Sequence, residues 1–314
     1  MQYRRLGQSG LLVSAVGLGC NNFGGMVAGL DLAGARAVID AAIDAGVTLF
    51  DTADSYGAEG GSEKVLGEVL GARRKDIVLA TKFASPMNRA VSTRYDGSRR
   101  YVMTAVEESL RRLKTDYIDL YQYHFPDPFT PREETLRALD DLVRQGKVRY
   151  IGVSNMPAWQ LVDAHWIAKT EGLPQFLSTQ AEYNLLSRGV EETLLPALSH
   201  MGMSLLPYFP LASGLLTGKY RKGQPLPAGR LQDIAYFRGL LTEERLTRVE
   251  MLLSFAESRG RSLLELAFAW LLAHQQVASV IAGATSPAQV RANAAAQDWT
   301  FTPDDLAELD MCLA

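Results

Sequence analysis

The chain has 314 residues, with 32 basic and 35 acidic side chains and a formal net charge of −3. This balance argues against a nucleic-acid partner and against an anionic membrane surface. The apolar runs are shorter than the ~20 residues of a membrane span, and the first residues lack a signal-peptide pattern. The two cysteines, Cys20 and Cys312, suggest neither a disulfide framework nor a metal site. We therefore expect a single cytoplasmic domain over residues 1–314, without bound metal and without nucleic-acid or membrane partners.

In chain order, the sequence opens with a predicted β-hairpin over residues 3–6 and 11–13, turned by glycine and serine. A strand near 16–19 follows, and strand-like and helix-like segments then alternate. The further strands are expected near 47–51, 77–82, 117–123, 148–153, 176–182, 203–208 and 277–282. The helices are expected near 31–45, 61–71, 98–113, 131–145, 157–171, 189–200 and 242–259. Such alternation indicates a parallel sheet, and the length suits a (β/α)8 TIM barrel of the α/β class.

Helix starts and one long connection refine this prediction. Thr130 with Pro131, and Ser286 with Pro287, each combine an N-cap hydroxyl with proline at the first helical position. Ser262 and Glu265 form a further capping box, which opens an extra helix to about residue 273 outside the simple alternation. Residues 209–241 are too long for an ordinary connection. We therefore expect a barrel with one or two extra helices and a long, lid-like loop after the seventh strand.

Ionisable side chains close three successive predicted strands. Asp51 and, shortly after it, Tyr56 follow the run near 47–51, Lys82 ends the next run, and His124 follows the one after. Because the carboxyl ends of barrel strands meet at one mouth, these positions indicate an active site. Any one of these residues alone is more often structural, as an ion pair, a loop anchor or a packed histidine. The set as a whole favours chemistry, because the four roles interlock.

The chain resembles the aldo-keto reductases over almost its whole length. Seven motifs carry the resemblance: FDTADSYG at 50–57, TK at 81–82, YH at 123–124, GVSN at 152–155, QAEYN at 180–184, LASGLLTGKY at 211–220 and IAGAT at 281–285. The resemblance implies an NADPH-dependent enzyme that reduces an aldehyde or ketone to an alcohol by hydride transfer. It also implies that Asp51, Tyr56, Lys82 and His124 are its catalytic residues.

The residue types suit that chemistry. Reduction of a carbonyl builds negative charge on oxygen, so a proton donor must reach it, and Tyr56 is the candidate. A free phenol has a pKa near 10, and a neighbouring Lys82 ammonium is expected to lower it. Asp51 would hold Lys82 in place, and His124 would orient the substrate oxygen.

The resemblance also assigns cofactor contacts. Ser154, Asn155 and Gln180 would hydrogen-bond the carboxamide, and Tyr208 would stack on the nicotinamide ring. The segment from Phe209 to Lys219 would wrap the pyrophosphate, with the assigned contacts Pro210, Leu211, Ser213, Gly214, Lys219 and Arg230. The adenosine end would be lined by Gly283, Thr285, Gln289 and Asn293, beside a helix start that favours a phosphate. Many relatives carry a cation just after the last strand, whereas here none precedes Arg291, so NADH use stays open beside NADPH.

The sequence also suggests residues for the substrate pocket and leaves two alternative functions open. The candidate pocket residues, chosen from loops that follow strands, are Asn21, Asn22, Phe23, Phe83, Phe125, Tyr236 and Phe237. They suit a small carbonyl substrate with an apolar body. The protein itself is expected to be a monomer or a homo-oligomer. A cofactor-binding regulatory subunit, similar to a potassium-channel beta subunit with little turnover, is the alternative function. A Schiff-base lyase using Lys82 is a third, although Asp51 would keep that lysine charged.

Overall fold

The computed structural model describes residues 1–25, 29–85, 95–227, 230–233 and 235–313; the side chains of residues 230, 233, 235, 236 and 313 lie outside that description. Eight strands form one sheet in the order β10-β3-β4-β5-β6-β7-β8-β9, and each strand in this order is parallel to the next. They are β3 (Val16–Gly19), β4 (Leu49–Asp51), β5 (Val78–Phe83), β6 (Ile118–Tyr123), β7 (Val148–Ser154), β8 (Ser178–Glu182), β9 (Ser204–Tyr208) and β10 (Val280–Gly283). A parallel bridge between Leu205 and Val277 joins the two ends, so the sheet is nearly closed.

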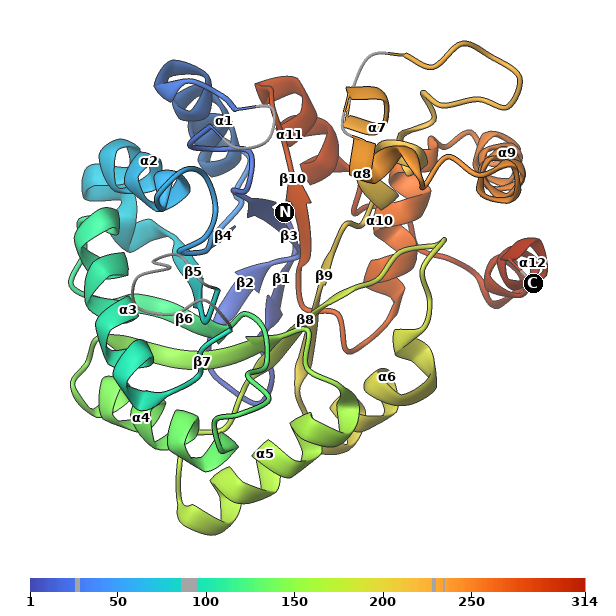
Figure 1. The fold of residues 1–314 in the computed structure, drawn as a ribbon. Helices are drawn as coiled ribbons and strands as arrows, with labels where there is room; N and C mark the ends of the chain where they lie inside the picture. Colours follow the sequence, from blue (N-terminus) through green and yellow to red (C-terminus); the bar gives the residue numbers. More distant parts are fainter. Residues whose placement is uncertain (26–28, 86–94, 228–229, 234, 314) are drawn as a thin grey trace.

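Helices surround this barrel (Figure 1). They are α1 (Leu32–Asp44), α2 (Gly61–Leu70), the 3-10 helix η1 (Gly71–Asp76), α3 (Arg99–Leu113), α4 (Arg132–Arg144), α5 (Ala158–Glu171), α6 (Val190–Met201), α9 (Glu243–Glu257), α10 (Leu263–Ala273), α11 (Pro287–Ala295) and α12 (Pro303–Leu313). None of the helices within the described ranges has the length and apolar character needed to cross a membrane. The predicted (β/α)8 barrel is thus confirmed, and its strand order follows the chain except at β10, which closes it.

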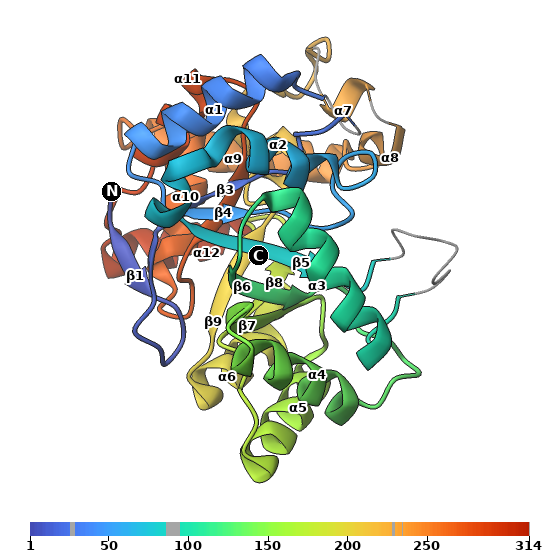
Figure 2. The ribbon, with the colours of Figure 1, turned by 90° about the vertical axis from the view of Figure 1, so that its left-hand side faces the viewer.

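The amino-terminal hairpin covers the end of the barrel where the strands begin. Strands β1 (Tyr3–Arg5) and β2 (Leu12–Ser14) pair antiparallel. The Gly7 amide donates to Ser204 Oγ (2.8 Å) at the start of β9, and Leu6 is fully buried in a cluster with the barrel-interior side chains Leu49 and Leu206. Figure 2 shows the hairpin on the opposite side of the barrel from α7 and α8. The hairpin therefore closes the floor and leaves the other end for a site.

The long segment after β9 contains short helices. It begins with the 3-10 segment η2 (Ala212–Thr217) and includes α7 (Arg230–Asp233) and α8 (Ala235–Arg238) before α9 starts at Glu243. The predicted long loop after the seventh barrel strand is present, but part of it is helical. The extra helix predicted from the capping box is α10, and both hydrogen bonds of the Ser262–Glu265 box are formed.

Of the two helix starts predicted from a hydroxyl followed by proline, the structure confirms one and corrects the other. Ser286 caps α11 by accepting from the Gln289 amide (3.3 Å), as expected. At α4, however, the N-cap is Pro131, and the Thr130 hydroxyl donates to Asp127 Oδ2 (2.6 Å) instead. The predicted Thr130 cap is therefore wrong, because the helix begins one residue later than expected and Thr130 lies outside its N-cap.

Candidate active site

A buried lysine joins the ends of two neighbouring strands. Lys82, near the end of β5, donates from Nζ to Asp51 Oδ2 (2.7 Å), to the Thr52 carbonyl (2.9 Å) and to the Tyr56 hydroxyl (3.2 Å). Asp51 is the last residue of β4, and Tyr56 lies on the loop that follows. Lys82 is 1% exposed and Asp51 2% exposed. The three hydrogen bonds use all the donors of the ammonium, so its position is fixed.

Burial and neighbouring charges act in opposite directions on this group. Burial raises the pKa of the Tyr56 phenol, and the Lys82 ammonium lowers it by less, so the pKa stays above its ordinary value of 10.0. Burial lowers the pKa of Lys82, but Asp51 and Tyr56 outweigh it and raise that pKa above 10.5. The prediction of a lowered Tyr56 pKa is therefore wrong in sign, because desolvation exceeds the effect of the cation. At neutral pH the phenol keeps its proton and the lysine stays charged.

His124 lies directly after β6 and completes the group. Its ring meets the Tyr56 ring edge-on with centroids 5.8 Å apart, and its Nδ1 lies 3.2 Å from Ser85 Oγ. Burial, helped by Lys82, lowers the pKa of His124 well below 6.5. The imidazole is therefore neutral at neutral pH, and Nε2 is the ring nitrogen left to meet a ligand.

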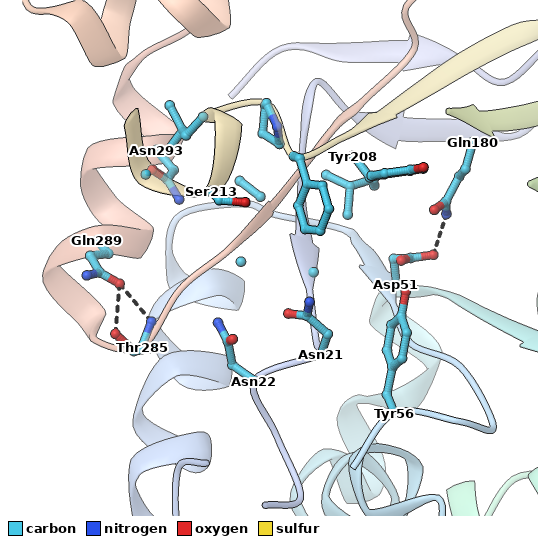
Figure 3. A pocket seen from close by; sticks show the side chains of 18 of the residues that line it. Asn21, Asn22, Asp51, Tyr56, Gln180, Tyr208, Ser213, Thr285, Gln289 and Asn293 are labelled. Carbon is cyan, nitrogen blue, oxygen red and sulfur yellow. Dashed lines mark hydrogen bonds between the residues drawn. The ribbon is translucent and has the colours of Figure 1, made fainter. Parts of the chain in front are cut away.

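A cavity of about 840 Å³ opens beside these side chains and is lined by Asp51, Tyr56 and His124. It extends from them past the end of β10 to the start of α11, as the labelled residues in Figure 3 show. Residues predicted to contact a cofactor line it throughout: Ser154, Asn155, Gln180, Tyr208, Pro210, Leu211, Ser213, Gly214, Lys219, Gly283, Thr285, Gln289 and Asn293. Arg230 begins α7, but its side chain lies outside the described ones.

Hydrogen bonds already order the cavity wall beside β7, β8 and β9. Asn155 has a left-handed φ of 57° and donates from Nδ2 to the His124 carbonyl (3.0 Å) and to Ser154 Oγ (3.0 Å). The Tyr208 hydroxyl donates to Asn155 Oδ1 (2.9 Å). Tyr208 is thus held by its hydroxyl at the wall of the cavity that it lines.

The segment after β9 has an irregular backbone beside the cavity. Phe209, Ala212, Ser213 and Gly214 all have positive φ, and Ser213 and Gly214 interrupt the helical conformation of η2. The Ala212 and Gly214 amides donate to the Phe209 and Leu211 carbonyls (2.9 and 2.8 Å), so side-chain charge is needed here to favour an anion. Among the described residues that line the cavity, Lys219 is the one lysine or arginine.

At the end of the cavity away from Tyr56, the side chain of Gln289 in α11 bonds to the residue before the N-cap, whereas in a capping box it would bond to the N-cap residue itself. Gln289 Oε1 accepts from the Thr285 amide (2.7 Å) and from the Thr285 hydroxyl (3.1 Å), as Figure 3 shows. Ser286 supplies the cap, and Asn293 lies one turn further on and is buried. This end of the cavity offers polar side chains and a helix amino terminus, which suits an adenosine with its phosphates.

The pocket residues predicted from the sequence divide into two groups. Asn21, Asn22 and Phe125 line the cavity, and Phe125 stacks on His124 with centroids 4.5 Å apart. Phe23 and Phe83 are fully buried and lie away from it, so these two predictions are corrected.

Phe83 lies away from the cavity because side chains alternate between the two faces of a strand. Lys82 faces the barrel interior, so its neighbour faces the helices, where Phe83 stacks between Tyr121 (4.8 Å) and Tyr123 (5.2 Å). Phe237 meets Phe209 edge-on at 6.0 Å and is not a lining residue, and the Tyr236 side chain lies outside the described ones.

One residue of the site escaped the sequence analysis. Gln122 on β6 is fully buried and donates from Nε2 to Asp51 Oδ1 (3.0 Å). It has no charge, and it lies two residues before His124 in a motif whose histidine dominates the signal. The lining residues Gly19, Leu264, Ile281, Ala282 and Ala292 were not predicted either, because small and apolar residues carry no chemical signature.

Comparisons with known proteins agree with this geometry. The sequence model described as "Aldo/keto reductase family" matches residues 15–314. The chain is 38% identical over 311 residues to a "Probable voltage-gated potassium channel subunit beta" of Oryza sativa subsp. japonica, covering 95% of this chain and 92% of that protein. It is 35% identical over 326 residues to the "L-glyceraldehyde 3-phosphate reductase" of Escherichia coli (strain K12), covering 100% and 93%. It is also 35% identical over 318 residues to "Aldo-keto reductase YhdN" of Bacillus subtilis (strain 168), covering 100% and 94%.

Proposed function

Because the chain belongs to the aldo/keto reductase family, we propose that it is an NADPH-dependent enzyme that reduces an aldehyde or ketone to an alcohol. One observation carries the proposal: the Tyr56 hydroxyl lies 3.2 Å from a buried ammonium, at the wall of a cavity of about 840 Å³. A protonated phenol that loses its proton beside a fixed cation is a general acid whose product is stabilised.

Each catalytic side chain has a distinct part in this proposal. Tyr56 donates its proton to the substrate oxygen, and the phenolate that forms is stabilised by Lys82 at 3.2 Å. Asp51 keeps Lys82 charged and in place through its 2.7 Å ion pair. Neutral His124 donates a hydrogen bond from Nε2 to the same oxygen and fixes its direction. In the reverse reaction, the Tyr56 phenolate takes the proton from the alcohol.

The cavity suits a nicotinamide dinucleotide in shape and in polarity. Its volume is in the range of small-molecule and cofactor sites. Asn155 and Gln180 would hold the carboxamide, Tyr208 the ring, and Lys219 with the positive-φ segment the pyrophosphate. Gln289 and Asn293 would hold the adenosine end. When bound, the cofactor supplies a hydride to the carbonyl carbon.

The choice between NADPH and NADH depends on the adenosine end. Residues 283–290 contain no lysine or arginine, and a 2′-phosphate there would meet hydroxyl, amide and helix-terminus donors instead. NADPH is proposed first, from the family, with NADH as the alternative. Titration of the purified protein with each nucleotide, followed by fluorescence, measures the ratio of the two affinities directly.

The substrate side of the cavity is aromatic. Phe125 stacks on His124 and also on Tyr95, at 4.7 Å, so three rings extend from the site toward the surface. An aldehyde with an apolar body fits this wall. The relative named for L-glyceraldehyde 3-phosphate reduction makes that compound the first phosphorylated aldehyde to test.

The decisive test of the proposed function is turnover. Purified protein with NADPH and a panel of aryl, alkyl and phosphorylated aldehydes should oxidise the cofactor. This reaction is measured as a loss of the near-ultraviolet absorbance of NADPH. Because burial keeps the Tyr56 pKa above 10.0, reduction should persist through neutral pH, whereas alcohol oxidation should increase as the pH rises toward that pKa. Absence of turnover with every carbonyl, under conditions where nucleotide binds, would contradict the proposal.

A regulatory subunit is the second candidate, favoured by the 38% identity to a protein named as a potassium-channel beta subunit. Such a protein would hold a nucleotide tightly and turn it over slowly or not at all. The same experiment separates the two functions, because tight binding without turnover supports regulation and turnover supports the enzyme.

A further inference from the structure

The two carboxylate oxygens of Asp51 have different partners. Oδ2 accepts from Lys82 (2.7 Å), whereas Oδ1 accepts from the side-chain amides of Gln122 (3.0 Å) and Gln180 (2.5 Å). Gln180 also donates to Gln122 Oε1 (3.1 Å). Figure 3 shows Gln180 directed at Asp51. A closed network of two amides and one carboxylate therefore lies directly behind the acid.

The direction of each hydrogen bond in this network is fixed. A carboxylate paired with an ammonium can only accept, so both glutamines must turn their NH₂ groups toward Asp51. Gln122 Oε1 then has to face Gln180, and it accepts from that amide. The three residues come from the alternate strands β4, β6 and β8, which is how one interior layer of a barrel is built.

The two glutamines differ in what else they can meet. Gln180 lines the cavity, whereas Gln122 is fully buried and is not among the lining residues. A ligand amide in the cavity can draw the Gln180 side chain away from Asp51. Gln122 cannot be reached by such a ligand, so its hydrogen bond to Asp51 persists.

We propose that Gln122 is a positioning residue for the reaction: it holds Asp51 aligned on Lys82 when Gln180 is engaged by the bound nucleotide. The inference rests on the proposed function, because it needs a carboxamide that competes for Gln180. Gln122 touches neither the substrate nor the cofactor and acts through Asp51.

This role has a consequence for proton transfer. The negative charge of Asp51 raises the pKa of Tyr56, and an amide N–H at Oδ1 reduces the field of that charge. Without the donor of Gln122, the phenol should hold its proton more tightly. Alcohol oxidation, which needs the phenolate, should then require a higher pH.

The test replaces Gln122 by methionine, which keeps the length of the side chain and removes its donor. For Gln122→Met we expect kcat for aldehyde reduction to fall about tenfold, as for other residues that orient a catalytic group. The pH of half-maximal alcohol oxidation should move upward, and the dissociation constant for the nucleotide should change by less than about twofold. Tyr121→Phe is the matched control on the same strand, because the Tyr121 hydroxyl has no hydrogen-bond partner among the described residues.

A second variant keeps the test decisive if Gln122→Met folds poorly. In Gln122→Glu, a protonated carboxyl can donate to Asp51 as the amide does, and an ionised one repels it. We expect this variant to approach wild-type kcat at low pH and to lose activity as the pH rises.

Three results would overturn the proposal while wild-type turnover stands. They are an unchanged pH profile in both variants, a loss confined to nucleotide affinity, and an equal effect of Tyr121→Phe. Absence of turnover in the wild type would instead contradict the proposed function itself, so the two failures are distinguishable.

Discussion

At the scale of single residues, the site depends on two side chains that stay charged although they are buried. Lys82 and Asp51 are almost completely buried, and each is the other's charged partner. Removing one partner of a buried pair leaves the other uncompensated, which typically costs 3–5 kcal/mol, or about the stability of a weak domain. The same burial keeps Tyr56 protonated, so one environment supplies both the acid and the cation that stabilises its conjugate base.

A second buried carboxyl nearby forms no ion pair with any residue in the part of the chain that the structure describes. Asp54 is 2% exposed, and its Oδ1 has no hydrogen-bond partner among the described residues. Burial, followed by the charge of Glu63, raises the pKa of Asp54 well above 3.8. The unfolded chain therefore releases this proton at lower pH than the folded protein does. The free energy of unfolding therefore decreases as the pH rises from about 3.8 to the folded-state pKa of Asp54, and this contribution is constant above that pKa.

Asp54→Asn should remove that penalty. We expect the variant to become more stable relative to the wild type from pH 4 upward, with a free energy of unfolding that exceeds the wild-type value by at most about 1.4 kcal/mol more for each pH unit. Urea unfolding at pH 5 and at pH 8 measures the difference. The exposed Asp116→Asn is the control and should show no such trend. A stability difference for Asp54→Asn that is equal at both pH values would contradict the interpretation.

Residues that carry charge, or that fall within one of the seven motifs, could be placed at the site from the sequence, whereas a buried uncharged residue outside those motifs could not. The strand ends at Asp51 and Lys82 and the histidine after β6 could be recognised because ionisable groups are rare in buried strands. Gln122 could not, since an uncharged amide in an apolar strand resembles packing. The net pKa of Tyr56 could not be predicted either, because it depends on how far burial exceeds the cation's effect.

At the scale of elements, α2 and α3 pack unusually closely. A Cβ on Gly67 of α2 would lie 2.3 Å from the Arg112 carbonyl oxygen and 2.8 Å from the Leu113 carbonyl carbon. Arg112 also donates to the fully buried Glu63 of α2 (2.7 Å). The glycine therefore allows the approach that brings this ion pair together.

Gly67→Ala should destabilise the protein by about 1–3 kcal/mol, because the added methyl group must push two backbones apart. Helix propensity alone predicts the reverse, a gain of about 1 kcal/mol. Gly189→Ala, at the N-cap of α6 with open space around its Cβ position, is the control. Thermal unfolding compares the two, and a Gly67→Ala protein as stable as the wild type would rule out the close contact.

Element positions could be predicted from the sequence to within about two residues for most helices and strands, as at α3 and β6. Ser262 and Ser286 cap their helices as predicted, by accepting from the Glu265 and Gln289 amides. The Thr130 cap is absent because α4 begins one residue later, with Pro131 at the N-cap, and the Thr130 hydroxyl donates to Asp127 outside the helix. A one-residue shift of a helix start is enough to remove a cap that the local pattern predicts.

At the scale of the whole molecule, the two ends of the barrel have separate tasks. The hairpin closes the end where strands begin, with Leu6 and Val13 fully buried in the interior cluster. The cavity occupies the end where strands finish, and residues from both the first and the last thirds of the chain line it. Stability and chemistry are therefore expected to respond to different substitutions, as is general for this fold.

Leu6→Ala should cost about 2–5 kcal/mol of stability, as expected for a buried leucine. Leu12→Ala on the same hairpin should cost less than about 0.5 kcal/mol, because Leu12 is 54% exposed. Neither change should alter KM for the nucleotide at a temperature where both proteins are folded. Urea unfolding with steady-state kinetics tests both statements, and a raised KM in Leu6→Ala would show that the two ends are coupled.

The barrel itself could be predicted because its alternation is periodic and its strands are apolar. The shape of the segment after β9 could not, since η2 owes its conformation to positive φ at Phe209, Ala212 and Ser213. The same segment is joined to a distant loop by the hydrogen bond from Asn184 Nδ2 to the Phe209 carbonyl (3.0 Å), a contact that no local pattern predicts.

The most direct test of the account is the proton donor. In Tyr56→Phe, hydride transfer from NADPH to an aldehyde, measured in a single turnover, should slow by about 10²–10⁴-fold, while nucleotide affinity stays near that of the wild type. Tyr95→Phe, which keeps the ring that stacks on Phe125, should react like the wild type. A Tyr56→Phe protein that reduces aldehydes at the wild-type rate would contradict the assignment of the acid.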